Sequence, residues 1–143
     1  MRSKIKKVYV AGALTYVEEA DKFSYEKLGA FLQQNGLEVF VPHMWGNDPI
    51  KDYKVIPSKI WKINQRQIST ADLVVAYVGK PSLGVGAELE ITRVSNVKLL
   101  LWAFEGEKIS RMALGNPAVL EVLIVKNEED LFKKIKNKIK TSF

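Results

Sequence analysis

Residues 73–78 read LVVAYV, an apolar run that ends at Gly79. A continuous run of this length, rich in β-branched and aromatic residues, is typical of a parallel strand covered on both faces. The next residues, 80–86, read KPSLGVG and predict a loop, and residues 87–95 predict a helix. The stretch therefore indicates a strand–loop–helix unit of a parallel α/β protein.

Strands and helices alternate on both sides of this unit. The helix before residue 35 is expected to stop at Asn35-Gly36, a pair that favours a left-handed C-cap. Within the helix before residue 71, Ile60, Trp61, Ile63 and Ile68 are expected to face the core. The other predicted strands are residues 7–11, 37–41, 98–103 and 119–125, and the other predicted helices are residues 21–34, residues 58–70 and a lysine-rich C-terminal segment.

This alternation predicts an α/β fold, a three-layer sandwich around a roughly five-stranded parallel sheet of flavodoxin-like or Rossmann-like type. A length of 143 residues suits one domain spanning residues 1–143. In open parallel sheets, ligands bind outside the carboxyl ends of the strands. We therefore look for the site in the loops that follow the strands.

The composition argues against disulfide bonds and against a metal site. The chain has no cysteine and a single histidine, His43, so the sequence favours neither a disulfide framework nor a metal centre, and we expect no metal or organic cofactor. No stretch reaches the roughly 20 apolar residues of a membrane helix. We expect a cytoplasmic protein without membrane contact.

The chain has 22 lysine and arginine residues against 16 aspartate and glutamate residues, which gives a net charge of +6. Much of this excess positive charge lies near the C-terminus. Five lysines alternate there with apolar residues at helical spacing, which favours a helix with a solvated basic side. Nucleic-acid binding is the alternative, but aromatic stacking residues do not interleave these lysines. The lysines are Lys133, Lys134, Lys136, Lys138 and Lys140.

The loop at residues 80–86 is the most informative of the loops at the carboxyl edge. Gly84 and Gly86 would let its backbone approach a ligand closely. Glu88 follows and is expected in the first turn of the next helix, where the helix dipole favours the anionic carboxylate. Such a carboxylate could attack an anomeric carbon in a double-displacement reaction, or it could simply complement the helix dipole.

Residues 71–76, ADLVVA, and residues 81–89, PSLGVGAEL, resemble the signature of the nucleoside 2-deoxyribosyltransferase superfamily. The similarity extends from Tyr9 to about Gly115 and is highest to the 2'-deoxynucleoside 5'-monophosphate N-hydrolase branch. The resemblance implies cleavage of the N-glycosidic bond of a 2'-deoxynucleoside or its 5'-monophosphate. The reaction would pass through a covalent deoxyribosyl ester of Glu88, which water would resolve in a hydrolase and a second base in a transferase.

The resemblance also implies a set of substrate contacts. Ser82 and Ser110 match positions at which the hydrolases have serine, and a neighbouring subunit would contribute Ser110, so a homodimer or higher oligomer is expected. Tyr9 and Gly12 match residues that line the sugar and phosphate end. His43 matches a histidine of the loop after the second strand, and a solvent-facing loop histidine is an equal alternative.

Two positions depart from the family pattern. Asn64 stands where the family usually has an aspartate that contacts the leaving base and can supply a proton, and an amide cannot act as a general acid. Thr15 stands where the hydrolases have a phosphate-binding arginine. The alternative function is therefore a catalytically impaired protein of the same fold that binds or senses nucleotides.

Overall fold

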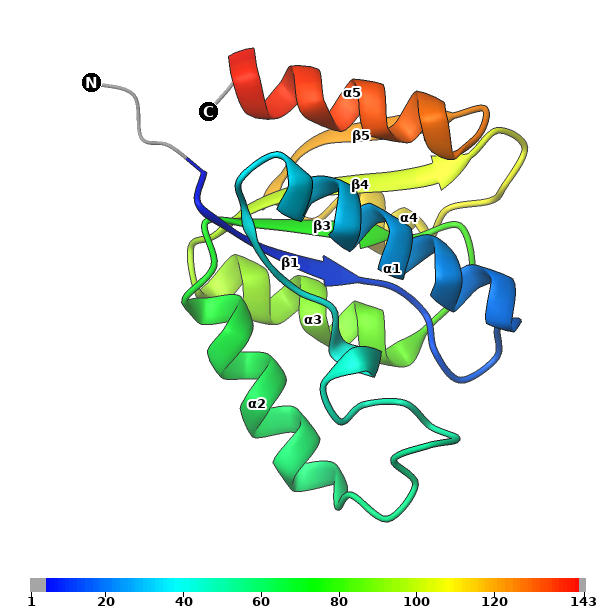
Figure 1. Ribbon diagram of the computed structural model, residues 1–143, viewed down its shortest axis with the longest axis vertical. Coiled ribbons are helices and arrows are strands. Elements are labelled where there is room, and N and C mark those ends of the chain that lie inside the picture. The colour runs from blue at the N-terminus through cyan, green and yellow to red at the C-terminus, as the bar shows by residue number, and fades with distance from the viewer. Residues whose placement is uncertain (1–4, 142–143) are drawn as a thin grey trace.

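The structure is a computed structural model that describes residues 5–141, and the ends of the predicted domain, residues 1–4 and 142–143, lie outside the described residues. Strands and helices alternate along the chain (Figure 1). The strands are β1 (Lys7–Ala11), β2 (Glu38–Phe40), β3 (Leu73–Tyr77), β4 (Lys98–Phe104) and β5 (Val119–Val125). The helices are α1 (Glu19–Gln34), the 3-10 helix η1 (Pro42–Met44), α2 (Pro57–Ser69), α3 (Leu83–Val94), α4 (Arg111–Leu114) and α5 (Glu128–Thr141).

The five strands form one parallel sheet in the order β2-β1-β3-β4-β5, which confirms the predicted α/β class and its flavodoxin-like topology. The strand order reverses between β1 and β3, which pair from Val8–Leu73 to Ala11–Ala76. Every residue of β3 is buried, as the continuous apolar run predicts. The reversal point fixes where a ligand site is expected.

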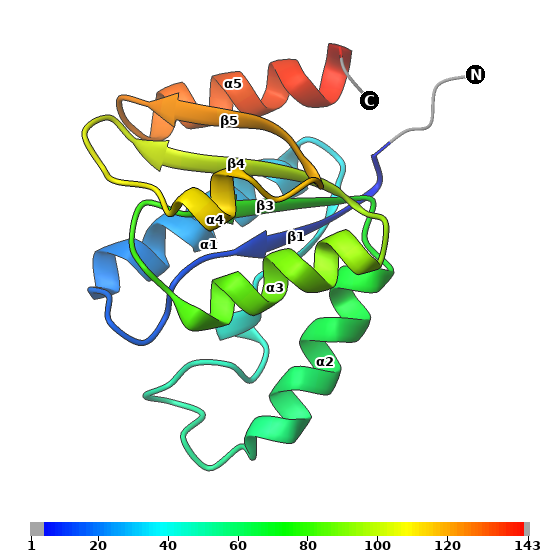
Figure 2. The ribbon, with the colours of Figure 1, turned by 180° about the vertical axis from the view of Figure 1, so that it is seen from behind.

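Each face of the sheet has its own apolar core. Val8 and Val10 of β1 pack on one face with α1 and α5, whereas Tyr9 and Ala11 pack on the other face with α2 and α3. Figure 1 shows α1 and α5 in front of the sheet, and Figure 2, the reverse view, shows α3 and α4. The expected three-layer arrangement is therefore present in the described residues.

The helix after β3 starts earlier than predicted. It begins at Leu83 rather than at residue 87, because the Ser82 hydroxyl oxygen accepts a hydrogen bond from the Val85 N–H at 3.1 Å and caps the first turn. Gly84 and Gly86 are therefore helical residues, and neither has a positive φ. Glu88 consequently lies in the second turn, and its expected place in the first turn is wrong.

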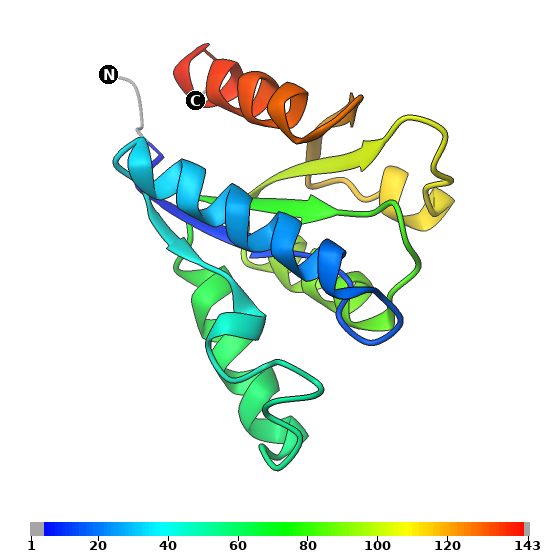
Figure 3. The same cartoon turned by 45° about the vertical axis from the view of Figure 1, so that its right-hand side comes forward.

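A long connection separates η1 from α2. In Figure 3, α2 and this connection project away from the body of the sheet. A buried ion pair fixes its start: Lys22 Nζ of α1 lies 3.4 Å from Asp48 Oδ1, and Asp48 also accepts hydrogen bonds from the N–H groups of Ile50 and Lys51. This buried ion pair holds the connection against α1, so the connection is an ordered loop.

The basic C-terminal helix is paired in part with acidic neighbours. Lys138 Nζ lies 2.7 Å from Glu121 of β5, and Lys134 Nζ lies 3.2 Å from Asp130. Leu131 and Ile135 of the same helix are buried in the core. These contacts support the expectation of a helix with one core face and one basic, solvated face. None of the described helices is long and apolar enough to cross a membrane.

Candidate active site

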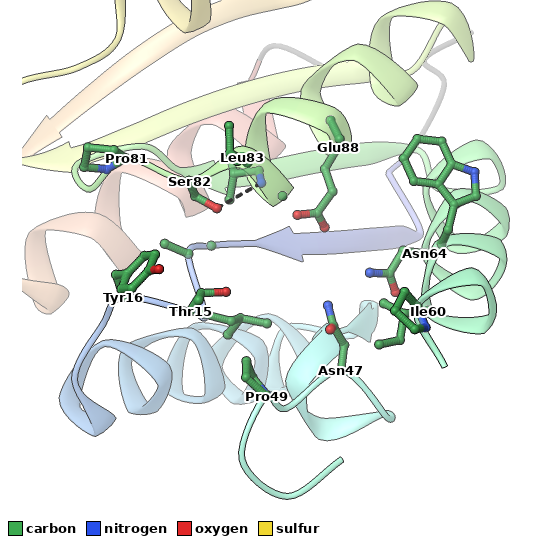
Figure 4. Close-up of a pocket in the computed structure, with 18 of the residues that line it drawn as sticks. Thr15, Tyr16, Asn47, Pro49, Ile60, Asn64, Pro81, Ser82, Leu83 and Glu88 are labelled. Atoms are coloured by element: carbon green, nitrogen blue, oxygen red, sulfur yellow. Dashed lines mark hydrogen bonds between the residues drawn. The ribbon is translucent and has the colours of Figure 1, made fainter. Parts of the chain in front are cut away.

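A cavity of about 800 Å³ opens beside the carboxyl ends of β1 and β3, at the reversal point of the sheet. This volume suits a ligand the size of a nucleoside. Figure 4 shows its walls, which come from the residues after β1, the connection before α2, α2 itself and the start of α3. The lining residues that the argument uses are Gly12, Thr15, Tyr16, Asn47, Ile60, Trp61, Asn64, Ser82, Leu83, Gly84, Glu88 and Ser110.

Glu88 is the carboxylate of this cavity. Its side chain leaves α3 and points into the cavity, with both oxygens toward the space between α3 and the opposite wall (Figure 4). Burial raises the pKa of Glu88 to about 7, and the hydrogen bond from Tyr9 opposes part of that rise. The group is therefore divided between its acid and carboxylate forms near neutral pH.

Tyr9 positions Glu88 from below. Its side chain is completely buried, its ring stacks on Phe40 at 5.6 Å between centroids, and its hydroxyl donates a hydrogen bond to Glu88 Oε2. Burial, together with the charge of Glu88, raises the pKa of Tyr9 well above its usual value, so the hydroxyl stays protonated. Tyr9 contacts the carboxylate rather than the cavity, whereas the resemblance implied a contact with substrate.

The other oxygen of Glu88 is the reactive candidate. Oε1 has no hydrogen-bond partner among residues 5–141, and Glu88 is half-buried. An oriented carboxylate with one free oxygen beside a sugar-sized cavity has the geometry of a nucleophile. The helix dipole contributes little, because its effect falls off after the first turn.

Asn64 is placed on the cavity by α2. It shares one face of that helix with Ile60, which lines the cavity, and Ile68, which is fully buried. Only 8% of Asn64 is exposed, and its carboxamide has no hydrogen-bond partner among the described residues. In Figure 4 the amide points toward the cavity. The carboxamide is not among the buried side-chain groups that lack a partner, so it is accessible from the cavity and free to bond to a ligand.

Ser82, Gly84 and Ser110 also line the cavity, as expected for site residues. The Ser110 hydroxyl oxygen caps α4 by accepting from the Ala113 N–H at 3.4 Å. Ser110 lines the pocket of its own chain, and its expected contribution to a neighbouring subunit's pocket stays a prediction. Both hydroxyl oxygens accept from the backbone, and each O–H remains able to donate to a ligand.

Gly12 lines the cavity for a packing reason. A Cβ at this position would lie 2.3 Å from Cζ of Tyr25, whose hydroxyl donates to the Ala13 carbonyl at 3.0 Å. Glycine therefore allows the turn after β1 to close over the Tyr25 ring. A direct contact of Gly12 with substrate remains a prediction.

Two expected site residues lie elsewhere. His43 is 5% exposed, and its Nε2 lies 2.9 Å from Glu26 of α1, so it neither lines the cavity nor faces solvent. Gly86 lines a neighbouring groove of about 510 Å³ between α3 and α4. The sequence could not reveal that these two residues lie outside the cavity. The 3-10 helix η1 turns His43 inward, and the cap at Ser82 extends α3 so that it includes Gly86.

Two further residues line the cavity. For Trp61 the sequence favours the core over stacking on a base, but its side chain is 50% exposed and lines the cavity, because the apolar stripe of α2 follows Ile60 and Ile68 instead. Asn47 comes from the aperiodic connection, and its side chain extends toward the cavity from the wall opposite Glu88 (Figure 4).

Residues 5–141 contain no group of three or more histidine, aspartate or glutamate side chains placed to hold a metal ion. Glu90, two residues after Glu88, lies away from the cavity and pairs with Arg93 at 2.6 Å, as its helical spacing predicts. Among the described residues, the polar side chains that line the cavity are one carboxylate, two amides and four hydroxyl groups.

The fold is shared with solved enzymes that act on nucleosides and nucleotides. The CMP N-glycosidase BcmB of Clostridium botulinum is 22% identical, with a TM-score of 0.68 over 92% of this chain and 99% of that chain. A 2-deoxyribosyltransferase of Bacillus psychrosaccharolyticus is 21% identical, with a TM-score of 0.66 over 88% and 90%. A 2-deoxyribosyltransferase of Leishmania mexicana is 12% identical, with a TM-score of 0.64 over 96% and 99%.

No protein-family model matches the chain, and neither does any curated protein sequence. The structural similarity therefore confirms the deoxyribosyltransferase-like fold, and the function has to be argued from the site.

Proposed function

We propose that this protein is an enzyme of the nucleoside 2-deoxyribosyltransferase superfamily that cleaves the N-glycosidic bond of a 2'-deoxynucleoside or its 5'-monophosphate. The observation that carries the proposal is the Glu88 carboxylate, which Tyr9 holds by one oxygen while the other faces a nucleoside-sized cavity. The solved structures with this fold include an N-glycosidase and a 2-deoxyribosyltransferase, which supports cleavage of an N-glycosidic bond as the reaction class.

In the first step, Glu88 Oε1 attacks the anomeric carbon and forms a glycosyl ester, while the bond from that carbon to the base breaks and its electron pair stays on the base nitrogen. In the second step, water or another base attacks the same carbon, and the ester oxygen leaves as the Glu88 carboxylate. Tyr9 donates to Oε2 throughout and holds the carboxylate in one orientation.

Asn64 and Asn47 are proposed to bind the base. Asn64 lies on α2 beside Glu88, and Asn47 extends from the opposite wall, so a base placed between them could bond to both amides (Figure 4). Trp61 and Ile60 add apolar surface at this end. Because neither amide can supply a proton, the base is proposed to take its proton from water as it leaves.

A second candidate function follows from the amide at residue 64. A protein with this cavity and no acid at residue 64 could bind nucleosides or nucleotides without turning them over. Glu88 separates the two functions, because a pure binding site gains nothing from a buried carboxylate whose pKa is raised to about 7.

The direct test is incubation of the protein with a panel of deoxynucleosides and their monophosphates, with and without a second free base. Base release, followed by chromatography, supports the enzyme, and a new nucleoside formed with the added base identifies a transferase. The Glu88→Gln variant is the control. Tight binding without any release by the native protein would favour the binding function.

We also propose that the protein forms homodimers. Leu83 and Met112 are apolar but 96% and 86% exposed, and they lie at the starts of α3 and α4, beside the groove shared by Ser82 and Ser110. Burial of such side chains favours association. Sedimentation and kinetics at one concentration test this, and a strictly monomeric protein with full activity would contradict it.

A further inference from the structure

The cavity has two chemically different ends. Asn64 lies at one end, Glu88 faces the middle, and Thr15, Tyr16 and Ser82 lie at the other end (Figure 4). If the base lies at Asn64 and the anomeric carbon at Glu88, as the proposed function requires, the 5'-carbon of the sugar extends toward the third group. That end is therefore where a 5'-substituent is recognised.

The 5' end offers hydroxyl groups and no cation. Among the described residues that line the cavity, none is lysine, arginine or histidine, and Glu88 is the one carboxylate. Two lysines lie on the neighbouring groove. Lys80 Nζ is 2.7 Å from Asp21, and Lys108 is exposed beside Ser110.

A phosphate dianion at this end would lack a counter-charge. The start of α3 at Leu83 contributes only about half an elementary charge. The Ser82 hydroxyl could donate a single hydrogen bond, because it has one O–H, and its oxygen accepts from the Val85 N–H. The phosphate would also repel the ionised form of Glu88 across a partly buried cavity, where charge interactions are weakly screened.

A free 5'-hydroxyl fits the same groups well. It is neutral, it can donate to or accept from Thr15 and Tyr16, and it can accept from Ser82. We therefore infer that the substrate of this site is an uncharged 2'-deoxynucleoside rather than its 5'-monophosphate, with Thr15, Tyr16 and Ser82 around the free 5'-hydroxyl. This inference rests on the proposed function and selects one of its two substrate classes.

The test is the ratio of kcat/KM for a deoxynucleoside to kcat/KM for its 5'-monophosphate, measured with the same base on the native protein, Thr15→Arg and Lys108→Ala. The native protein should favour the nucleoside by about 10-fold or more. Thr15→Arg supplies a bidentate cation and should shift the ratio toward the monophosphate by about 10-fold or more. Lys108→Ala should leave the ratio unchanged.

A native protein that favours the monophosphate overturns the inference while the proposed function stands. Loss of that preference in Lys108→Ala would then place the phosphate in the neighbouring groove. If neither compound is cleaved, the proposed function fails, and calorimetry of both compounds on the native protein decides the inference. Tighter binding of the nucleoside supports it, whereas tighter binding of the monophosphate, or no binding of either, overturns it.

Discussion

Two tyrosine–glutamate pairs lie on opposite faces of the sheet and differ in one respect. Tyr9 donates to Glu88 on the α3 face, and Tyr77 donates to Glu107 on the α1 face, both from fully buried rings. Glu107 Oε1 also accepts from the Phe104 N–H at 2.7 Å, so both of its oxygens are bonded. Glu88 Oε1 has no such partner within residues 5–141 and faces the cavity.

From this difference we propose that Glu107 is a structural carboxylate and Glu88 a reactive one. Glu107 closes the turn after β4, and a Cβ on Gly79 would lie 2.1 Å from its Oε1, so the Gly79 backbone packs closely against that oxygen. Glu88 has the same kind of tyrosine partner but an open side. A hydrogen bond from tyrosine to a half-buried glutamate is therefore not evidence of a site by itself, and the proposal rests on the unpaired oxygen that faces the cavity.

The largest expected effect separates the two glutamates. Glu88→Gln should lower base release by at least about 10³-fold, because the amide is a poor nucleophile. Glu107→Gln, the matched control, keeps an acceptor for Phe104 and should stay within a few fold of the native rate. Initial rates measured by chromatography give both values. Comparable losses in the two variants would show that Glu88 acts through the fold.

Asn64→Asp sharpens the contrast by adding an acid to the open side. A positioned acid beside the leaving nitrogen should raise turnover at mildly acidic pH, with about 10²-fold as the lower end of general-acid contributions and poor leaving groups gaining most. The new carboxyl could instead raise the pKa of Glu88 further by repulsion. Comparison of pH–rate profiles and melting temperatures tests this. A stable variant that is slower on every substrate at every pH would refute the role given to Asn64.

The tyrosines should differ in their effect on the pH profile. Turnover should rise with pH through about 7 as Glu88 ionises. Tyr9→Phe removes the hydrogen bond that lowers the pKa of Glu88, so the rising limb should move to higher pH and turnover at pH 7 should drop roughly 5-fold. Tyr77→Phe should leave the limb in place. An equal displacement by both variants would contradict the assignment of Tyr9 as a positioning residue.

The smallest expected effect is on the free energy of unfolding of the Glu88 and Glu107 variants. The pKa of Glu88 is about 7 in the folded protein, above its value of about 4.5 in an unfolded chain, so the folded state holds a proton that the unfolded state releases between these values. Stability is therefore lost as pH rises through this window. Glu88→Gln should be about 3 kcal/mol more stable than the native protein at pH 8 and equal to it near pH 4. Urea unfolding at both pH values measures this.

Glu107→Gln is the control for the stability series, since both of its carboxylate oxygens are already bonded. It should show no gain at pH 8. The difference in unfolding free energy between Glu88→Gln and the native protein should change between the two pH values. An unchanged difference would show that burial does not raise the pKa of Glu88.

The fold was largely predictable because its determinants are local. The buried run of β3, the Asn35-Gly36 stop and the apolar period of α1 each specify one element, and the strand–helix alternation leaves few topologies. The start of α3 was missed because the cap of Ser82 outweighs two glycines, whose helix propensity argued for a loop.

Part of the site was predictable from the sequence. Glu88 was expected from its place after the loop at residues 80–86, Asn64, Ser82 and Ser110 were expected from the resemblance, and all four line the cavity. The burial of His43, the exposure of Trp61 and the approach of Asn47 depend on the path of the connection after η1, which follows neither helical nor strand period. Tertiary packing, such as the buried pair of Lys22 and Asp48, sets that path.

The covalent role of Glu88 can be tested most directly by trapping. A deoxyribosyl substrate that carries fluorine at the 2-position should form the ester and then resolve it slowly, so that the intermediate accumulates. Peptide mass spectrometry should find the mass of the fluorinated sugar on the peptide that contains Glu88 and no added mass in Glu88→Gln. Base release without added mass on Glu88, or a label on another residue, would contradict the account.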